Sequence, residues 1–308
     1  MVGKWIGAAP TQTETANSGV FSISDINYLK DEDEYYKDFD LQCEYLVVGG
    51  GGHGPGGFSG GYGAGGGGAG GLRNSYASEN TGGGGSTEAK KGIILGQQYT
   101  ITIAAGSTNV GTGDLGATAT PSEFDNIKAI GGGNGSRFGS TANLGDSGFS
   151  SGAGQAGRGT SGTYATYLFN NPTQGFVGGN RSGYIGGAGG GAAGAGGNAY
   201  ADGAALSSSI TGSAVDYAKG GSGGRNTSHY NGTAGAANTG NGGRAGAYAG
   251  AGYGSTNGGA GGSGVVILRY PNTYTISVGV GLTTGGELTD GSDKYIKFTG
   301  GTDTVSWS

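Results

Sequence analysis

The sequence predicts an all-β protein with an antiparallel β scaffold, a glycine-rich body and long surface loops. Three observations lead to this prediction. Glycine accounts for 80 of the 308 residues, against about 7% in average proteins. Short runs of β-branched and aromatic residues lead directly into or out of the glycine tracts. The polar inserts between these tracts show no helical period.

The strands of the scaffold are expected in segments that lie far apart in the sequence. Residues 45–48 (YLVV) run straight into glycine, and residues 265–268 (VVIL) emerge from glycine and end before Pro271. Residues 99–103 (YTITI) alternate apolar and polar side chains, which is the period of a half-buried strand. A further strand is expected in SEFDNIKAI, and two or three more follow residue 271, where Gly-Gly and Asp-Gly pairs mark turns.

The glycine tracts must be held together mainly by backbone contacts, because glycine brings no side chain to a core. Glycine segments can adopt left-handed polyproline-II helices of three residues per turn and pack closely side by side. Disorder is the alternative for tracts such as GGAGGGAAGAGG. Collagen is excluded, because the chain has only 5 prolines and keeps no Gly-X-Y repeat.

Changes in composition divide the chain into three parts. Residues 1–41 are poor in glycine and are expected to be an attachment segment, with a short strand near Val20, a short helix from Ser24 and an acidic cluster from Asp31. Residues 42–271 form the glycine-rich domain, and residues 272–308 form a C-terminal β segment.

Charge and hydropathy exclude some partners. The net charge of −5 argues against nucleic acid, which is bound by clustered Lys and Arg. The charge is uneven, since Arg and Lys outnumber Asp between residues 129 and 264, where there is no Glu. No stretch approaches the roughly 18 apolar residues of a membrane span, and the first residues lack the apolar run of a signal peptide. We therefore expect synthesis in a cytoplasm and no membrane span.

Catalytic motifs are not expected to be functional in this chain. The G-x-S-x-G pattern occurs around Ser59, Ser150 and Ser222, but without the strand and helix that a nucleophile elbow requires. The two histidines, His53 and His229, cannot make a multi-histidine metal site within one copy. The carboxylate pair of Asp290 and Asp293 lies in a turn-like context, where solvated turn residues are expected rather than a calcium or glycosidase site. The lone Cys43 is expected to be a buried apolar residue. We expect no enzyme activity, no metal and no cofactor.

Aromatic residues in the inserts are the positive functional signal. They lie among Ser, Gly, Asn and Thr, a mixture typical of binding loops. Aromatic rings with polar neighbours suit sugars or protein loops, and arginine suits phosphate or carboxylate. The alternative is that these aromatic residues pack on bare glycine backbone or against another subunit. The candidate receptor-binding residues are Tyr164, Tyr167, Phe169, Phe176, Tyr184, Tyr200, Tyr217 and Tyr230.

Two segments carry a resemblance to a known family. EYLVVGGGGHGPGGFSGGYGAGGGGAGG at 44–71 and GGAGGSGVVILRYP at 258–271 resemble the first and last strands of the glycine-rich domains of bacteriophage tail fibres and adhesins. The resemblance implies a virion appendage protein that recognises the host through loops at the tips of stacked polyglycine helices. It implies attachment to other virion proteins through residues 1–41, a host surface glycan or outer-membrane protein as receptor, and a trimeric state.

Two other functions stay open at this point. The first is a purely structural virion component, such as a decoration, collar or fibre-shaft protein, in which the loops make subunit contacts. The second is a polyglycine-bundle protein unrelated to phage, such as a secreted or ice-binding one. The missing signal peptide and the irregular tripeptide spacing count against this second alternative.

Overall fold

The computed structural model describes residues 12–13, 16–17, 40–57, 63–108, 119–136, 173–225, 227, 229–247 and 255–308. The chain forms two units, Met1–Asp40 and Leu41–Ser308. In the first unit, β1 (Gln12–Thr13) pairs antiparallel with β2 (Ala16–Asn17). The strand expected near Val20, the helix from Ser24 and the acidic cluster lie outside the described residues.

The second unit confirms the all-β prediction, since its described residues contain strands and one 3-10 turn, η1 (Gly82–Gly84), but no α-helix. All strand pairs are antiparallel. The strands of the large sheet are β3 (Leu41–Val48), β4 (Leu72–Asn74), β5 (Lys91–Ile93), β6 (Tyr99–Thr102), β7 (Ser122–Phe124), β8 (Ile127–Ala129), β11 (Val265–Pro271), β12 (Ile276–Val278), β13 (Leu282–Asp290) and β14 (Asp293–Trp307). A separate hairpin consists of β9 (Leu206–Ser208) and β10 (Val215–Tyr217).

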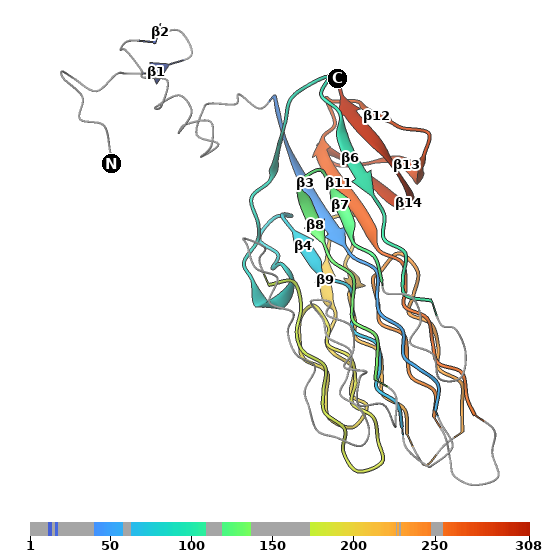
Figure 1. Cartoon of the computed structure of the whole chain (residues 1–308). Coiled ribbons are helices and arrows are strands. Elements are labelled where there is room, and N and C mark those ends of the chain that lie inside the picture. Colours follow the sequence, from blue (N-terminus) through green and yellow to red (C-terminus); the bar gives the residue numbers. More distant parts are fainter. Residues whose placement is uncertain are drawn as a thin grey trace, which may run out of the picture. The chain divides into compact units, whose positions relative to one another are not determined.

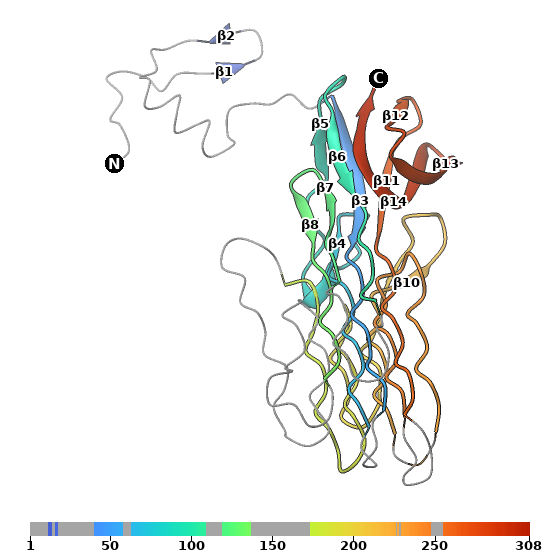
Figure 2. The same ribbon diagram turned by 45° about the vertical axis from the view of Figure 1, so that its right-hand side comes forward.

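The long strand β14 joins the two halves of the large sheet. Its first part pairs with β11 up to Phe298, and its last part pairs with β6 from Thr302 onward. Gly301 lies between these parts with a φ of +92°, a conformation that side chains disfavour. The strand order β4-β3-β11-β14-β6-β7-β8 therefore curls into a nearly closed barrel (Figure 2). The segment after residue 271 thus supplies three strands of the same sheet, β12, β13 and β14.

The central strands β3 and β11 are buried on both faces. Their alternate residues Tyr45 and Leu268 face a core that also contains Trp307. Their other face, which includes Leu46 and Ile267, packs on a second core with the β9–β10 hairpin. Burial on both sides explains why these strands read as continuous apolar runs rather than as alternating ones.

Hydrogen bonds show how the glycine tracts pack. The tract of residues 63–71 has three neighbours, and it donates to each of them at every third residue. Gly63, Gly66 and Ala69 donate to Tyr184, Gly187 and Gly190; Gly65, Gly68 and Gly71 to Ser136, Gly133 and Ile130; Gly67 and Gly70 to Gly243 and Gly240. A β-strand has a period of two, whereas three residues per turn is the period of polyproline II. The hydrogen bonding therefore follows the packing that the sequence led us to expect.

Candidate functional site

The hydrogen-bond register fixes how far each residue lies from the strands. Gly49 follows β3 and bonds to Gly71, whereas Gly63, eight residues earlier in that neighbouring tract, bonds to Tyr184. Gly224 is at the same level, since it donates to Ala64. Figure 1 shows the strands gathered at one end of this unit and the tracts running to turns at the other. We call this second end the distal end, defined by residues 57, 63, 184, 225 and 247.

Several inserts are attached at the distal end. Segments 58–62 and 248–254 lie outside the described residues, but residues 57, 63 and 247 on their flanks are distal. The longest insert, residues 137–172, starts after Ser136, whose carbonyl accepts a hydrogen bond from Gly65. The candidate residues Tyr164, Tyr167 and Phe169 belong to this insert and so lie outside the described residues.

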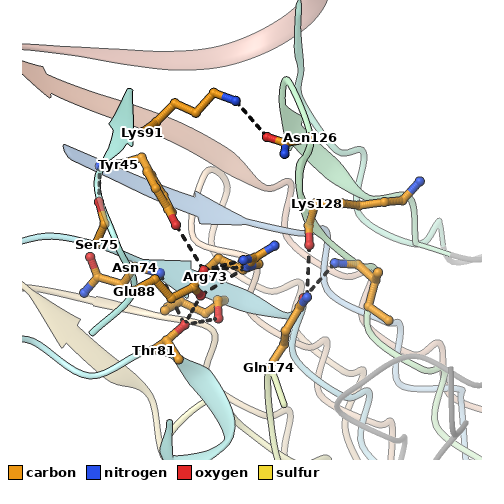
Figure 3. A network of polar contacts seen from close by, with 12 residues as sticks. Tyr45, Arg73, Asn74, Ser75, Thr81, Glu88, Lys91, Asn126, Lys128 and Gln174 are labelled. Atoms are coloured by element: carbon orange, nitrogen blue, oxygen red, sulfur yellow. Dashed lines mark hydrogen bonds and ion pairs between the residues drawn. The ribbon is translucent and has the colours of Figure 1, made fainter. Parts of the chain in front are cut away.

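The long insert returns to the sheet at Gln174, which is fully buried. The side-chain amide of Gln174 donates to the carbonyl oxygen of Lys128 at 2.9 Å and accepts from the Ile130 nitrogen at 3.1 Å (Figure 3). Its own carbonyl accepts from Leu72. Beside it, Glu88 accepts hydrogen bonds from Tyr45 and Arg73 (Figure 3). The described residues on the two sides of this insert therefore lie at different levels, Ser136 toward the distal end and Gln174 at the sheet.

One of the candidate tyrosines, Tyr200, stacks on an arginine at the distal end, and Tyr184 lies near this pair in the backbone register. The guanidinium carbon of Arg225 lies 3.6 Å from the centre of the Tyr200 ring. The backbone of Gly186 links the two segments. Its carbonyl oxygen accepts a hydrogen bond from the Tyr200 N–H, and its own N–H donates to the carbonyl oxygen of Gly224, next to Arg225. Tyr184 lies two residues before Gly186, and its side chain is 54% exposed. Tyr184, Tyr200 and Arg225 thus share one part of the surface.

A second arginine–tyrosine pair lies across the neighbouring tracts. The guanidinium carbon of Arg244 is 4.0 Å from the centre of the half-buried Tyr230 ring. Residue 245, next to Arg244, donates its backbone N–H to Ser222, three residues before Arg225. We call the five side chains Tyr184, Tyr200, Arg225, Tyr230 and Arg244 the distal aromatic site.

A small polar groove adjoins the distal aromatic site and shares Arg244 with it. Its volume is about 160 Å³, and four glycines are part of its lining: Gly220, Gly221, Gly235 and Gly242. Lys219 and Asp202 form an ion pair of 2.6 Å there, and Ser222 also donates to Asp202. The side chains that line the groove are those of Asp202, Lys219, Ser222, Thr233, Asn241 and Arg244. These groups offer hydrogen-bond donors and acceptors side by side.

Two candidate residues lie elsewhere. Tyr217 is 1% exposed and packs in the second core. Burial, together with the nearby Glu79, raises its pKa to about 12. Phe176 is half-buried near Gly84, beside the η1 turn. Neither side chain belongs to the distal aromatic site, and we leave both out of the proposed contact surface.

The other side chains that could take part in catalysis or metal binding are buried or paired with neighbouring residues. Asp290 and Asp293 lie 2.8 and 3.0 Å from the buried guanidinium of Arg269, so they form an ion-pair network instead of a merely solvated turn. His53 is buried, with Nδ1 3.1 Å from the Ser107 hydroxyl. Cys43 is buried, and desolvation raises the pKa of its thiol. Within the described ranges, no group of three or more His, Cys, Asp or Glu residues could hold a metal ion.

Sequence reasoning did not assign the two arginines to specific tyrosines. Arg225 and Arg244 follow glycines in different tracts. Only the register of the hydrogen-bonded glycine tracts places them against Tyr200 and Tyr230. The available signal was the excess of Arg and Lys over Asp between residues 129 and 264.

Comparison with known proteins supports one family. No helix among the described residues is long and apolar enough to cross a membrane. A search of curated proteins finds no match. The family model described as "Glycine-rich domain" matches residues 38–271, which is about three quarters of the chain. The chain therefore belongs to the glycine-rich domain family.

Proposed function

We propose that this chain is a non-enzymatic binding protein of a bacteriophage particle, of the tail-fibre or adhesin type, and that its distal end contacts the host surface. The observation that carries the proposal is the clustering of exposed Tyr184 and Tyr200 with Arg225 where the glycine tracts turn. Tyrosine gives large contact area at low entropy cost, and this suits recognition. Residues 1–41 attach the protein to other virion proteins, and the virion is its location.

The glycine body gives this proposal a mechanical basis. Each tract is tied to several neighbours by backbone bonds near 2.9 Å, so the distal end is held by a lattice rather than by a conventional core. Loops that connect such tracts can vary in sequence without disturbing the packing below them. A rigid support with variable loops is the arrangement expected of a receptor-binding protein.

The test is binding of purified protein to candidate bacterial cells. The variant Tyr184→Ala with Tyr200→Ala should lose at least about tenfold in affinity, because exposed aromatic anchors dominate recognition energy. Val280→Ala is the control, since Val280 is fully exposed and lies in the turn between β12 and β13. A triple variant of Tyr164, Tyr167 and Phe169 to Ala tests the long insert separately. Circular dichroism and thermal melting check that each variant is folded.

A second candidate function is a structural virion component, and one observation favours it. A groove of about 370 Å³ between the β9–β10 hairpin and strands β13 and β14 is lined by Val215, Leu288 and Tyr295. Exposed apolar surface of this kind is typical of contacts between subunits. If no plausible host binds the wild-type protein, and Leu288→Lys dissociates a trimer in solution, this structural role replaces the adhesin role.

A further inference from the structure

Three arginines at the distal end have no carboxylate partner among the described residues: Arg181, Arg225 and Arg244. Asp202, which lines the polar groove together with Arg244, already pairs with Lys219. At the sheet end, by contrast, acidic partners are present for most basic residues: Arg73, Lys90, Lys91, Lys128, Arg269 and Lys294 each have one, and among the described residues there only Lys297 has none. The distal end is therefore cationic, although the whole chain carries a net charge of −5.

Stacking prepares two of these arginines to bind an anion. At 3.6 and 4.0 Å from the ring centres, the guanidinium groups of Arg225 and Arg244 are in contact with the faces of Tyr200 and Tyr230. A guanidinium held on a ring face keeps the N–H groups at its rim for a bidentate carboxylate. The Nε atom of Arg244 is buried and has no hydrogen-bond partner in the described part of the chain. A bound water or a ligand oxygen would satisfy such a donor.

The neighbouring groups suit a sugar ring that carries this anion. Tyr184 and Tyr200 are 54% and 39% exposed, and aromatic residues at the surface suit stacking on a sugar ring. The polar groove beside Arg244 offers the Ser222 and Thr233 hydroxyls and the Asn241 amide. Its volume of about 160 Å³ is below the roughly 300–1,000 Å³ of pockets for drug-sized ligands. It therefore suits one unit of a polymer.

We infer that the distal aromatic site binds an acidic polysaccharide, with carboxylates on Arg225 and Arg244 and sugar rings on Tyr184 and Tyr200. This inference rests on the proposed function and names its ligand class. It predicts that both the rings and the charges of the ligand are needed, because neither the tyrosines nor the arginines form the site alone.

The experiment compares three polymers by isothermal calorimetry: polygalacturonate, which has a carboxylate on every ring; dextran, which is neutral; and polyglutamate, which has carboxylates without rings. Wild-type protein should bind polygalacturonate and neither of the others at comparable affinity. The variant Arg225→Gln with Arg244→Gln should bind at least about tenfold more weakly, since it removes both charged hydrogen-bond donors from the ligand carboxylates. Lys90→Gln is the control for charge, because it removes one positive charge, as each arginine substitution does, but at the sheet end, where Lys90 pairs with Glu44.

Three results would overturn the inference: no binding to polygalacturonate, equal binding of dextran or polyglutamate, or equal losses in the arginine variant and the Lys90→Gln control. Cell binding, measured in parallel, separates this failure from failure of the proposed function. Cells that bind the double arginine variant normally, but not the Tyr184 and Tyr200 variant, would leave the adhesin role intact and remove the acidic ligand.

Discussion

Gly66 donates its backbone N–H to the carbonyl oxygen of Gly187 at 3.0 Å, across two tracts that are 121 positions apart in the sequence. A Cβ atom on Gly66 would lie only 1.9 Å from the carbonyl oxygen of Gly221 on a third tract. Real Cβ atoms do not approach backbone so closely, so a single methyl group would push the tracts apart. The lattice therefore requires glycine at this position because of its neighbours.

The first prediction concerns this close approach. Gly66→Ala should lower the free energy of unfolding by about 1–3 kcal/mol or more, as overpacking does in cores. Gly285→Ala is the control, because Gly285 has nothing within 4 Å of its Cβ position and no positive φ. Urea unfolding followed by circular dichroism measures both. Equal stability of the two variants would contradict the lattice.

The second prediction separates a packing tyrosine from a surface tyrosine. Tyr217→Ala removes a ring from the second core and should cost about 3–5 kcal/mol, the range for large-to-small aromatic substitutions. Tyr184→Ala, at an exposed position, should change stability by no more than about 0.5 kcal/mol. Thermal melting compares them. A large loss with Tyr184→Ala would assign that tyrosine to packing and weaken the proposed contact surface.

The third prediction concerns the buried Arg269. Hydrogen bonds to Asp290 and Asp293 outweigh the cost of burying Arg269 and raise its pKa. Replacing both aspartates by Asn should destabilise the protein by about 1–3 kcal/mol, because a buried charge then loses its partners, which are themselves partly exposed. Glu123→Gln breaks the surface pair with Lys128 and should cost at most about 1 kcal/mol. Denaturant unfolding measures the loss of stability in both variants. Equal losses would contradict a stabilising role of the Arg269 ion pairs.

The fourth prediction is a loss of stability in alkali. Burial raises the Tyr217 pKa from 10.0 to about 12, so the folded state holds its proton more tightly than the unfolded state. The stabilisation is fully present below pH 10 and disappears as the pH rises from 10 to 12, at up to about 1.4 kcal/mol per pH unit. Tyr45 and Tyr270 have pKa values raised in the same direction, so part of the loss belongs to them.

Unfolding in urea at pH 8 and pH 11 checks this prediction. The variant Tyr217→Phe should lose less stability over that interval than the wild-type protein does. If the two proteins lose the same amount of stability, the ionisation of Tyr217 does not contribute to the loss.

The strands were predictable where the chain itself shows the pattern. Residues 45–48 and 265–268 are buried on both faces, and the alternation of residues 99–103 gives β6. Pairing could not be derived in this way, because β14 reaches both β11 and β6 only through the bend at Gly301. Nothing local in the sequence determines which distant strands a long strand contacts.

The candidate site was only partly predictable, for a similar reason. Tyrosines among small polar residues were visible, but Tyr200 and Tyr217 have the same kind of sequence surroundings and opposite burial. Their difference depends on whether the lattice register places them at a turn or against Leu206 and Ile210. The arginine partners depend on that register as well.

The central claim is that the distal end contacts the host. Blocking one end of the protein at a time tests it most directly. Cys43 is buried, so a thiol introduced at the surface can be labelled selectively with a bulky polyethylene glycol maleimide. Tyr184→Cys places the label at the distal end, and Val280→Cys places it in the fully exposed turn between β12 and β13. We predict that labelling at 184 abolishes binding to host cells, beyond any effect of the substitution itself, and that labelling at 280 does not. Binding that survives the label at 184 and is lost with the label at 280 would contradict the claim.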